Sequence, residues 1–171
     1  MALDIKSSPQ FAGAHNLLAN CGEARSGERL LLCYEPSNLG YYDQKIIDDV
    51  HYCALEMDLA VTLCELNFDP YIAQLPTGLD QAMDNADLTV FLARTADQMR
   101  FSNFKVDQRY IISYALTGAS LASAFGAVNY EATQRLKSVV DQAIFSAEKI
   151  DISCPAGTAF SGVINQASEG R

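Results

Sequence analysis

The chain has 171 residues, of which 49% are hydrophobic, and its 12 basic and 21 acidic side chains give a formal net charge of −9. Because lysine and arginine supply most of the attraction to phosphate groups, this acidic balance argues against a nucleic-acid groove or an anionic membrane surface. A chain of this length buries roughly 70% of its unfolded surface, so we expect a single α/β domain over residues 1–171 whose core needs neither a metal ion nor a disulfide.

The sequence carries no sign of export or membrane insertion. No apolar run approaches the ~20 residues that span a bilayer. The first residues have neither a basic region nor a continuous apolar stretch, so the pattern predicts a cytoplasmic protein. The cysteines are odd in number, widely spaced and never in a Cys-x-x-Cys pair, and we predict that they are reduced structural thiols, with a reactive thiol as the alternative. They are Cys21, Cys33, Cys53, Cys64 and Cys154.

Helical periodicity and short apolar runs alternate through the first half of the chain. A helix is predicted to open at Ser8-Pro9 and to stop at Gly22. A compact apolar run over residues 29–34 is typical of a strand covered on both faces. After a polar connection the pattern predicts a helix capped by Asp43, and a second strand over residues 60–66.

The same alternation continues in the second half. Residues 94–108 break it as a long polar segment, which we read as a loop with a function or a partner. The other predicted elements are a short helix over 77–86, strands over 87–93, 109–116 and 151–154, a helix beginning near Ser120, a long helix over 131–150, and a possible edge strand over 159–165.

Five strands that alternate with helices through short turns favour one architecture. Right-handed crossovers leave few other arrangements, so the sequence predicts a three-layer α/β/α sandwich around a mostly parallel, about five-stranded Rossmann-like sheet.

Open parallel sheets bind ligands outside the carboxyl ends of their strands. A ligand or partner crevice would therefore be lined by the polar residues that follow the predicted strands, unless these groups only form turns and cap helices. Arg94 and Arg100 could hold a carboxylate, or could pair with Asp97 and Asp107 on the loop. The crevice residues are Glu35, Asn38, Asn67, Asp69, Arg94, Arg100, Thr117 and Ser120.

Signatures of known chemistries are absent from the sequence. The first strand-to-helix turn has no Gly-x-Gly-x-x-Gly, and no Walker loop is present, which argues against nucleotide binding. His15 and His51 are far apart and belong to no zinc motif. No Gly-x-Ser-x-Gly elbow supports a nucleophilic serine. We therefore predict no catalytic residue, no metal ligand and no cofactor in this chain.

Four short segments carry a family resemblance: LANCG (18–22), SGER (26–29), ADLTV (86–90) and IDISCPAGT (150–158). Together with the order of the elements, they resemble the amino-terminal domain of thermophilic-type aminopeptidases, that is aminopeptidase T and the leucyl-aminopeptidase-like metallopeptidases. They are also similar to the related ring-opening dihydroxypyridine dioxygenases.

This resemblance implies a domain without chemistry of its own. In that family the divalent metal ions are held by Glu, His and Asp residues of a second, carboxyl-terminal domain, which would begin near the end of this chain. No family ligand carries over to a position here, and the usual Gly-Thr-Asp is Gly157-Thr158-Ala159. A divalent metal is thus expected only where a carboxyl-terminal domain is present, and the amino-terminal domain would shape substrate access and oligomer contacts.

Three functions remain open from the sequence. The chain is a non-catalytic amino-terminal domain of an aminopeptidase-like or dioxygenase-like protein, or a free-standing scaffold that recognises a peptide or a partner enzyme through residues 94–108, or a small enzyme that uses the crevice residues. Phe101 and Phe104 in a polar segment, and a strand edge near Cys154, also predict self-association or a protein partner.

Overall fold

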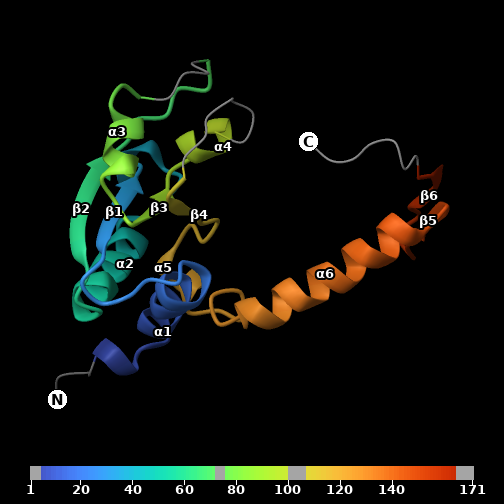
Figure 1. Cartoon of the computed structure of the whole chain (residues 1–171), viewed down its shortest axis with the longest axis horizontal. Coiled ribbons are helices and arrows are strands. Elements are labelled where there is room, and N and C mark those ends of the chain that lie inside the picture. The colour runs from blue at the N-terminus through green and yellow to red at the C-terminus, as the bar shows by residue number, and fades with distance from the viewer. Residues whose placement is uncertain (1–4, 72–75, 100–106, 165–171) are drawn as a thin grey trace. The chain divides into compact units, whose positions relative to one another are not determined.

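The computed structural model describes residues 5–71, 76–99 and 107–164 (Figure 1). The chain divides into two compact units, unit 1 over Met1–Val128 and unit 2 over Asn129–Arg171. Unit 1 contains a parallel sheet with helices on both faces, and unit 2 contains one long helix and a two-stranded hairpin.

The sheet of unit 1 has four parallel strands in the order β2-β1-β3-β4. These are β1 (Arg29–Tyr34), β2 (Ala60–Glu65), β3 (Leu88–Leu92) and β4 (Arg109–Ile112). The chain passes from β1 outward to β2 and then returns to the other side of β1 as β3. The carboxyl ends of β1 and β3 therefore form the topological switch point of the sheet, where open parallel sheets bind their ligands.

The predicted layers are confirmed, because alternate residues of the central strands face two separate apolar clusters. Leu30 and Leu32 of β1 pack with one cluster, and Leu31 and Cys33 pack with the other. All of β3 is buried, whereas β2 at the sheet edge is largely exposed. This is the burial expected of an α/β/α sandwich with a Rossmann-like sheet.

Each face of the sheet has its own helices. The first face is covered by α1 (Pro9–His15), the π-helical turn η2 (Asn16–Cys21), α2 (Gln44–Glu56) and α5 (Gly118–Leu121), and the second by α3 (Leu79–Asp84) and α4 (Thr95–Met99). Two 3-10 turns, η1 (Ile5–Ser7) and η3 (Ser37–Leu39), complete unit 1.

Local capping explains why several helices begin where the sequence predicts. The Phe11 N–H donates to Ser8 Oγ at 3.1 Å, and the Ile46 N–H donates to Asp43 Oδ1 at 2.8 Å. Each such cap contributes about 1 kcal/mol to its helix. The predicted starts at Ser8-Pro9 and Asp43 are confirmed.

The prediction of about five strands in the sheet is wrong, because the fifth strand belongs to another structure. In unit 2, β5 (Lys149–Ser153) pairs antiparallel with β6 (Ala159–Val163) in a separate two-stranded sheet. The connection is a tight turn in which the Cys154 N–H donates to the Thr158 carbonyl and Gly157 adopts a φ of 97°. A connection this short can only join antiparallel neighbours.

Three further boundaries differ from the sequence prediction. The polar segment 94–108 contains α4, a helix too short to show a period, which buries Ala96 and Met99. The strand predicted over 109–116 ends at Ile112. The long helix α6 (Tyr130–Ser146) ends before residue 150, because Lys149 and Ile150 pair with β6 instead.

Ion pairs join the amino ends of the strands. Asp87, just before β3, accepts hydrogen bonds from the Arg29 N–H at 2.8 Å and from Arg29 Nη2 at 2.9 Å. Arg109 Nη2, at the start of β4, donates to Glu28 Oε1 at 2.7 Å. Hydrogen bonds from the Arg29 side chain, followed by that from its backbone, hold the pKa of Asp87 well below its usual range.

Asp87→Asn is expected to make unit 1 less stable at neutral pH, by an amount that shrinks in acid. Because folding lowers the pKa of Asp87, its contribution is present above the unfolded-state pKa of about 4 and is lost as pH falls through the folded-state pKa. Melting temperatures of both proteins, measured from neutral to strongly acidic pH, should converge. Asp84→Asn is the control, since Asp84 is exposed on α3 and makes no ion pair within the described residues. If the melting temperatures of Asp87→Asn and the unsubstituted chain differed by the same amount at every pH, this account would be contradicted.

Candidate functional site

Side chains from three strand ends meet at the switch point of the sheet, and we call Glu35, Tyr41, Tyr42, Phe68 and Arg94 the carboxyl-end cluster. Glu35 directly follows β1, and Arg94 lies two residues beyond β3. Phe68 comes from the turn after β2, and the two tyrosines follow η3. The cluster thus occupies the position where this fold would bind a ligand.

The centre of the cluster is a buried ion pair. Glu35 has an exposed fraction of 0%. Arg94 Nη2 donates to Glu35 Oε2 at 2.7 Å, and Arg94 Nε lies 3.0 Å from each carboxylate oxygen. The Arg94 backbone N–H also donates to Glu35 Oε1. Both oxygens of Glu35 are therefore satisfied by a single residue, and the carboxylate raises the pKa of Arg94.

Aromatic rings fix the guanidinium of Arg94 in place. Its Cζ atom lies 4.6 Å from the centre of the Tyr41 ring and 4.3 Å from the centre of the Phe68 ring, which are cation–π distances. Tyr42 is buried beside them, and its hydroxyl donates to the Ser113 carbonyl at 2.8 Å. Burial raises the pKa of Tyr42, so the phenol stays protonated.

The electrostatics of the pair favour a structural role for Arg94. Its positive charge is balanced by Glu35, and its side chain is only 26% exposed. A guanidinium held in this way is a poor receptor for a further carboxylate, because a second anion would meet the charge of Glu35. Asp97, which the sequence offered as a loop partner for Arg94 or Arg100, accepts a hydrogen bond from the Tyr114 hydroxyl at 2.5 Å. The ion pair therefore fixes the end of β1 to the end of β3.

Two other predicted crevice residues lie together beyond β4. The Ser120 N–H donates to Thr117 Oγ1 at 3.1 Å, and the two hydroxyl oxygens are 3.0 Å apart. With Tyr114 and Phe125 they line an open hollow of about 460 Å³. Thr117 is the N-cap of α5, so its hydroxyl serves the capping role that we considered as the alternative to a site.

The remaining predicted residues do not join the cluster. Asn38, Asn67 and Asp69 are exposed, and Asp69 accepts a hydrogen bond from the Tyr71 N–H at 2.8 Å, as turn-forming residues do. Arg100 lies outside the described residues. Sequence reasoning missed the aromatic members of the cluster, and their only signal was aromatic residues in strand-end loops.

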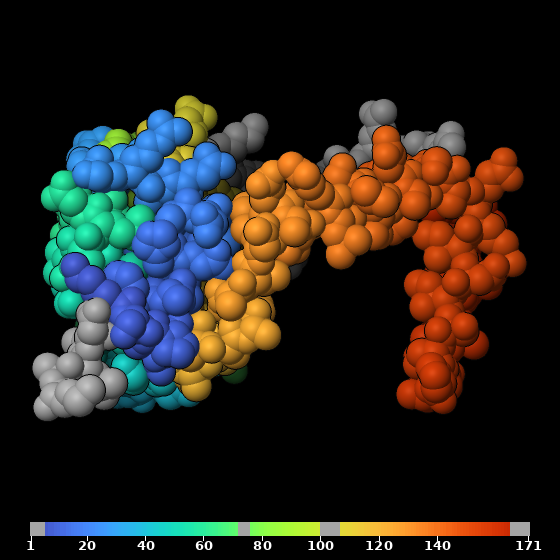
Figure 2. All heavy atoms as spheres, turned by 90° about the horizontal axis from the view of Figure 1, so that it is seen from below, coloured from blue at the N-terminus to red at the C-terminus, as the bar shows by residue number. Residues whose placement is uncertain are grey.

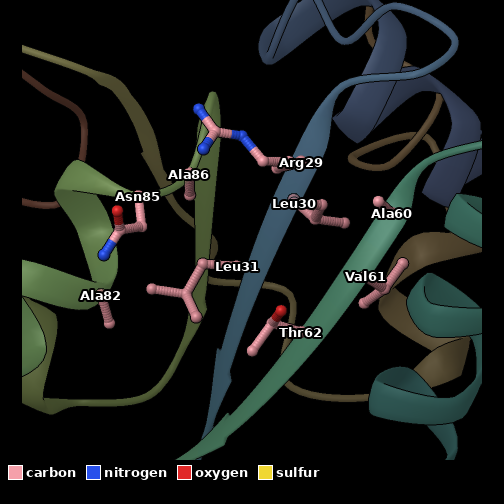
Figure 3. A pocket seen from close by; sticks show the side chains of 9 residues that line it. All are labelled: Arg29, Leu30, Leu31, Ala60, Val61, Thr62, Ala82, Asn85 and Ala86. Atoms are coloured by element: carbon pink, nitrogen blue, oxygen red, sulfur yellow. The ribbon is translucent and has the colours of Figure 1, made fainter.

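A second hollow lies toward the amino end of the sheet (Figure 3) and encloses about 330 Å³. Figure 3 shows Leu31 and Thr62 on the side of α3, which contributes Ala82 to the wall. Its charged side chain, Arg29, is already bound to Asp87. None of the predicted crevice residues that the structure describes lines it.

The described residues lack the features of a metal site and of a membrane-spanning helix. They contain no group of three or more His, Cys, Asp or Glu side chains placed to hold a metal ion. Among the helices of those same ranges, none has the length and apolarity that a membrane crossing requires.

Comparison with known proteins supports the fold. No family model matches the chain, and no curated protein matches it. The structure of 2,5-dihydroxypyridine dioxygenase from Pseudomonas putida KT2440 is similar with a TM-score of 0.59 at 15% identity, over 92% of this chain and 47% of that chain. The complex of VinN with L-aspartate has a TM-score of only 0.38 at 16% identity, over 76% and 29% of the two chains, which is too weak to carry an argument.

Of the family resemblance, these comparisons support the fold alone. The fold is that of part of the dihydroxypyridine dioxygenase, and this chain spans about half the length of that solved structure. The aminopeptidase part of the resemblance finds no support among the solved structures described above.

Proposed function

We propose that this chain is a non-catalytic domain that docks onto a second protein domain, and that this second domain carries the metal and the chemistry. The observation that carries the proposal is an apolar stripe on α6, formed by Leu136, Val139, Val140 and Ile144. These side chains are between 40% and 65% exposed. Their spacing of three and four residues places them on one side of the helix, which is typical of a helix whose apolar face is buried.

Charged side chains lie beside this stripe, and the exposed Phe145 is an apolar side chain of α6 outside it. Arg135 Nη2 lies 2.6 Å from Glu131 Oε1, and Lys137 pairs with Asp141, so charged pairs flank the stripe. On the side shown in Figure 2, the hairpin of unit 2, drawn in red, leaves most of α6, drawn in orange, uncovered. The hairpin also exposes Ile152 and Phe160, which are direct partners in its register. Apolar surface of this kind marks an interaction site.

The solved dioxygenase suggests what covers this surface. Unit 2 is about a quarter of the chain, and 92% of the chain is matched, so most of unit 2 has a counterpart in that enzyme. The counterpart belongs to a chain about twice as long. A second domain in such a chain is therefore the partner that we propose for the stripe.

Unit 1 fits a supporting role. Its switch-point charges neutralise each other in the Glu35–Arg94 pair, and Thr117 caps a helix. The peptide-binding alternative depended on residues 94–108. Within the part of that segment that the structure describes, Arg94 is already bound to Glu35, which leaves its guanidinium unsuited to hold a peptide carboxylate.

The proposal is tested by affinity capture from an extract of the source organism with this chain as bait. We expect the chain to retain a polypeptide that binds a divalent metal ion. Val140→Glu should reduce its recovery at least about tenfold, because the charge would have to be buried at the contact. Mass spectrometry and metal analysis of the eluate identify the partner.

Ser138→Glu is the matched control, because Ser138 lies two residues from Val140, on the side of α6 opposite the stripe. It introduces the same charge and should leave capture unchanged. Equal capture by Val140→Glu and the unsubstituted chain would overturn the proposal. A stable homodimer in sedimentation that Val140→Glu dissociates would also overturn it, since the stripe would then be covered by a second copy.

A further inference from the structure

Two cysteines that are 31 residues apart in the sequence lie opposite each other in the sheet. Cys33 of β1 and Cys64 of β2 are direct partners in the parallel register. Their side chains lie on the face covered by α3, where both pack with the same apolar cluster.

The two thiols differ in access to solvent. Cys33 has an exposed fraction of 0%, whereas Cys64 is half-buried on the edge strand β2. The preceding residues on that face, Leu31 and Thr62, line the open hollow of Figure 3. A small reagent can therefore reach Cys64 from the edge of the sheet, whereas Cys33 is closed to solvent.

We propose that Cys33 and Cys64 form a redox-active dithiol, in which Cys64 is attacked by low-molecular-weight disulfides and Cys33 then closes a reversible disulfide between β1 and β2. Adjacent strands lie about 4.8 Å apart. This spacing falls inside the range of Cα separations that a disulfide spans. The inference concerns unit 1 and is independent of the proposed docking function.

The pKa shifts of the two thiols agree with these roles. The neighbouring Cys33 lowers the pKa of Cys64 to about 7, against the opposing effect of burial. A thiol with a pKa near neutral pH is the best attacking group in thiol–disulfide exchange. The neighbouring Cys64, together with burial, raises the pKa of the Cys33 thiol.

With glutathione disulfide as the oxidant, the exchange balances in two steps. The Cys64 thiolate attacks one sulfur of glutathione disulfide, which forms a Cys64–glutathione bond and releases one glutathione thiolate. Cys33 Sγ then attacks Cys64 Sγ, its proton passes to the released thiolate, and the second glutathione leaves. The two protein thiols are oxidised to one disulfide, and glutathione disulfide is reduced to two molecules of glutathione.

The experiment uses a protein in which Cys21, Cys53 and Cys154 are replaced by alanine, so that only the proposed pair remains. After treatment with glutathione disulfide, mass spectrometry of non-reduced digests should show the Cys33–Cys64 crosslink as the main product. Addition of Cys33→Ala should stop the reaction at one glutathione on Cys64. Addition of Cys64→Ala should leave Cys33 at least about tenfold less modified, because it is buried.

Two results would overturn the inference. One is a pair protein that accumulates the Cys64 mixed disulfide without closing it. The other is a Cys64→Ala protein that takes up glutathione as fast as the Cys33→Ala protein.

A measurement on the unsubstituted chain guards against misfolded variants. Phenylarsine oxide bridges two neighbouring thiols, so it should protect Cys33 and Cys64 from alkylation while the exposed Cys154 still reacts. Alkylation of Cys64 at the same rate with and without the arsenical would also contradict the pairing.

Discussion

Glu35→Gln is expected to lower the free energy of unfolding of unit 1 by about 3 kcal/mol. The change removes the negative charge that balances Arg94, whose side chain is 26% exposed, and leaves the guanidinium largely buried without a counter-ion. Breaking a buried ion pair costs about 3–5 kcal/mol, and the partial exposure of Arg94 places the expected loss at the lower end. Urea unfolding followed by circular dichroism measures it, and hydrogen exchange of the β1 and β3 amides assigns it to the sheet.

Two further variants separate the ion pair from the general effect of the substitution. Glu56→Gln is the same chemical change in unit 1, at a pair with Lys6 whose side chain is 58% exposed, and should lose far less stability. Combining Glu35→Gln with Arg94→Met should recover part of the loss, because the buried charge is then gone and Met fits between the rings of Tyr41 and Phe68. If Glu35→Gln unfolds like the unsubstituted chain, the ion pair does not fix β1 to β3.

Elements that depend on local sequence could be predicted closely. The apolar run from Arg29 to Tyr34 is β1 residue for residue, because its turn signals and continuous hydrophobicity lie within the segment itself. The Asp43 cap was equally readable, since the capping side chain and the N–H that it accepts from are three residues apart. The pairing of residues 149–163 could not be predicted in this way, because a strand of that composition can join either a larger sheet or a hairpin.

In the candidate site too, single residues could be predicted from the local sequence, but contacts between distant segments could not. The rule that ligands lie at strand ends identified Glu35 and Arg94 separately, but their pairing requires β1 and β3 to be neighbours. The sequence order of the strands does not determine this, since β2 lies between them in the chain and on the other side of β1 in the sheet. The pairing of Cys33 with Cys64 could not be predicted for the same reason, because only the register of β1 on β2 brings them together.

Gly13→Ala is expected to have the second large effect on stability. A loss of unfolding free energy would indicate close packing at this position, whereas a gain would indicate helix propensity. Gly13 lies in α1, where a Cβ atom would come within 2.1 Å of the Leu121 carbonyl oxygen on α5. A Cβ on Gly126 would come within 1.9 Å of the same oxygen, so two glycines enclose this carbonyl. A backbone atom held from both sides cannot move aside as the end of a flexible side chain would.

We expect Gly13→Ala to lower the free energy of unfolding of unit 1 by about 2 kcal/mol. Alanine gains about 1 kcal/mol over glycine inside a helix, but overpacking against backbone costs about 3 kcal/mol, so the clash prevails. The control is Ala12→Gly, at the exposed neighbouring position of α1, which should lose about 1 kcal/mol through propensity alone. Urea unfolding measures both variants. A Gly13→Ala protein as stable as the unsubstituted chain, or more stable, would mean that α1 does not lie against the Leu121 backbone and that propensity governs position 13 as it does position 12.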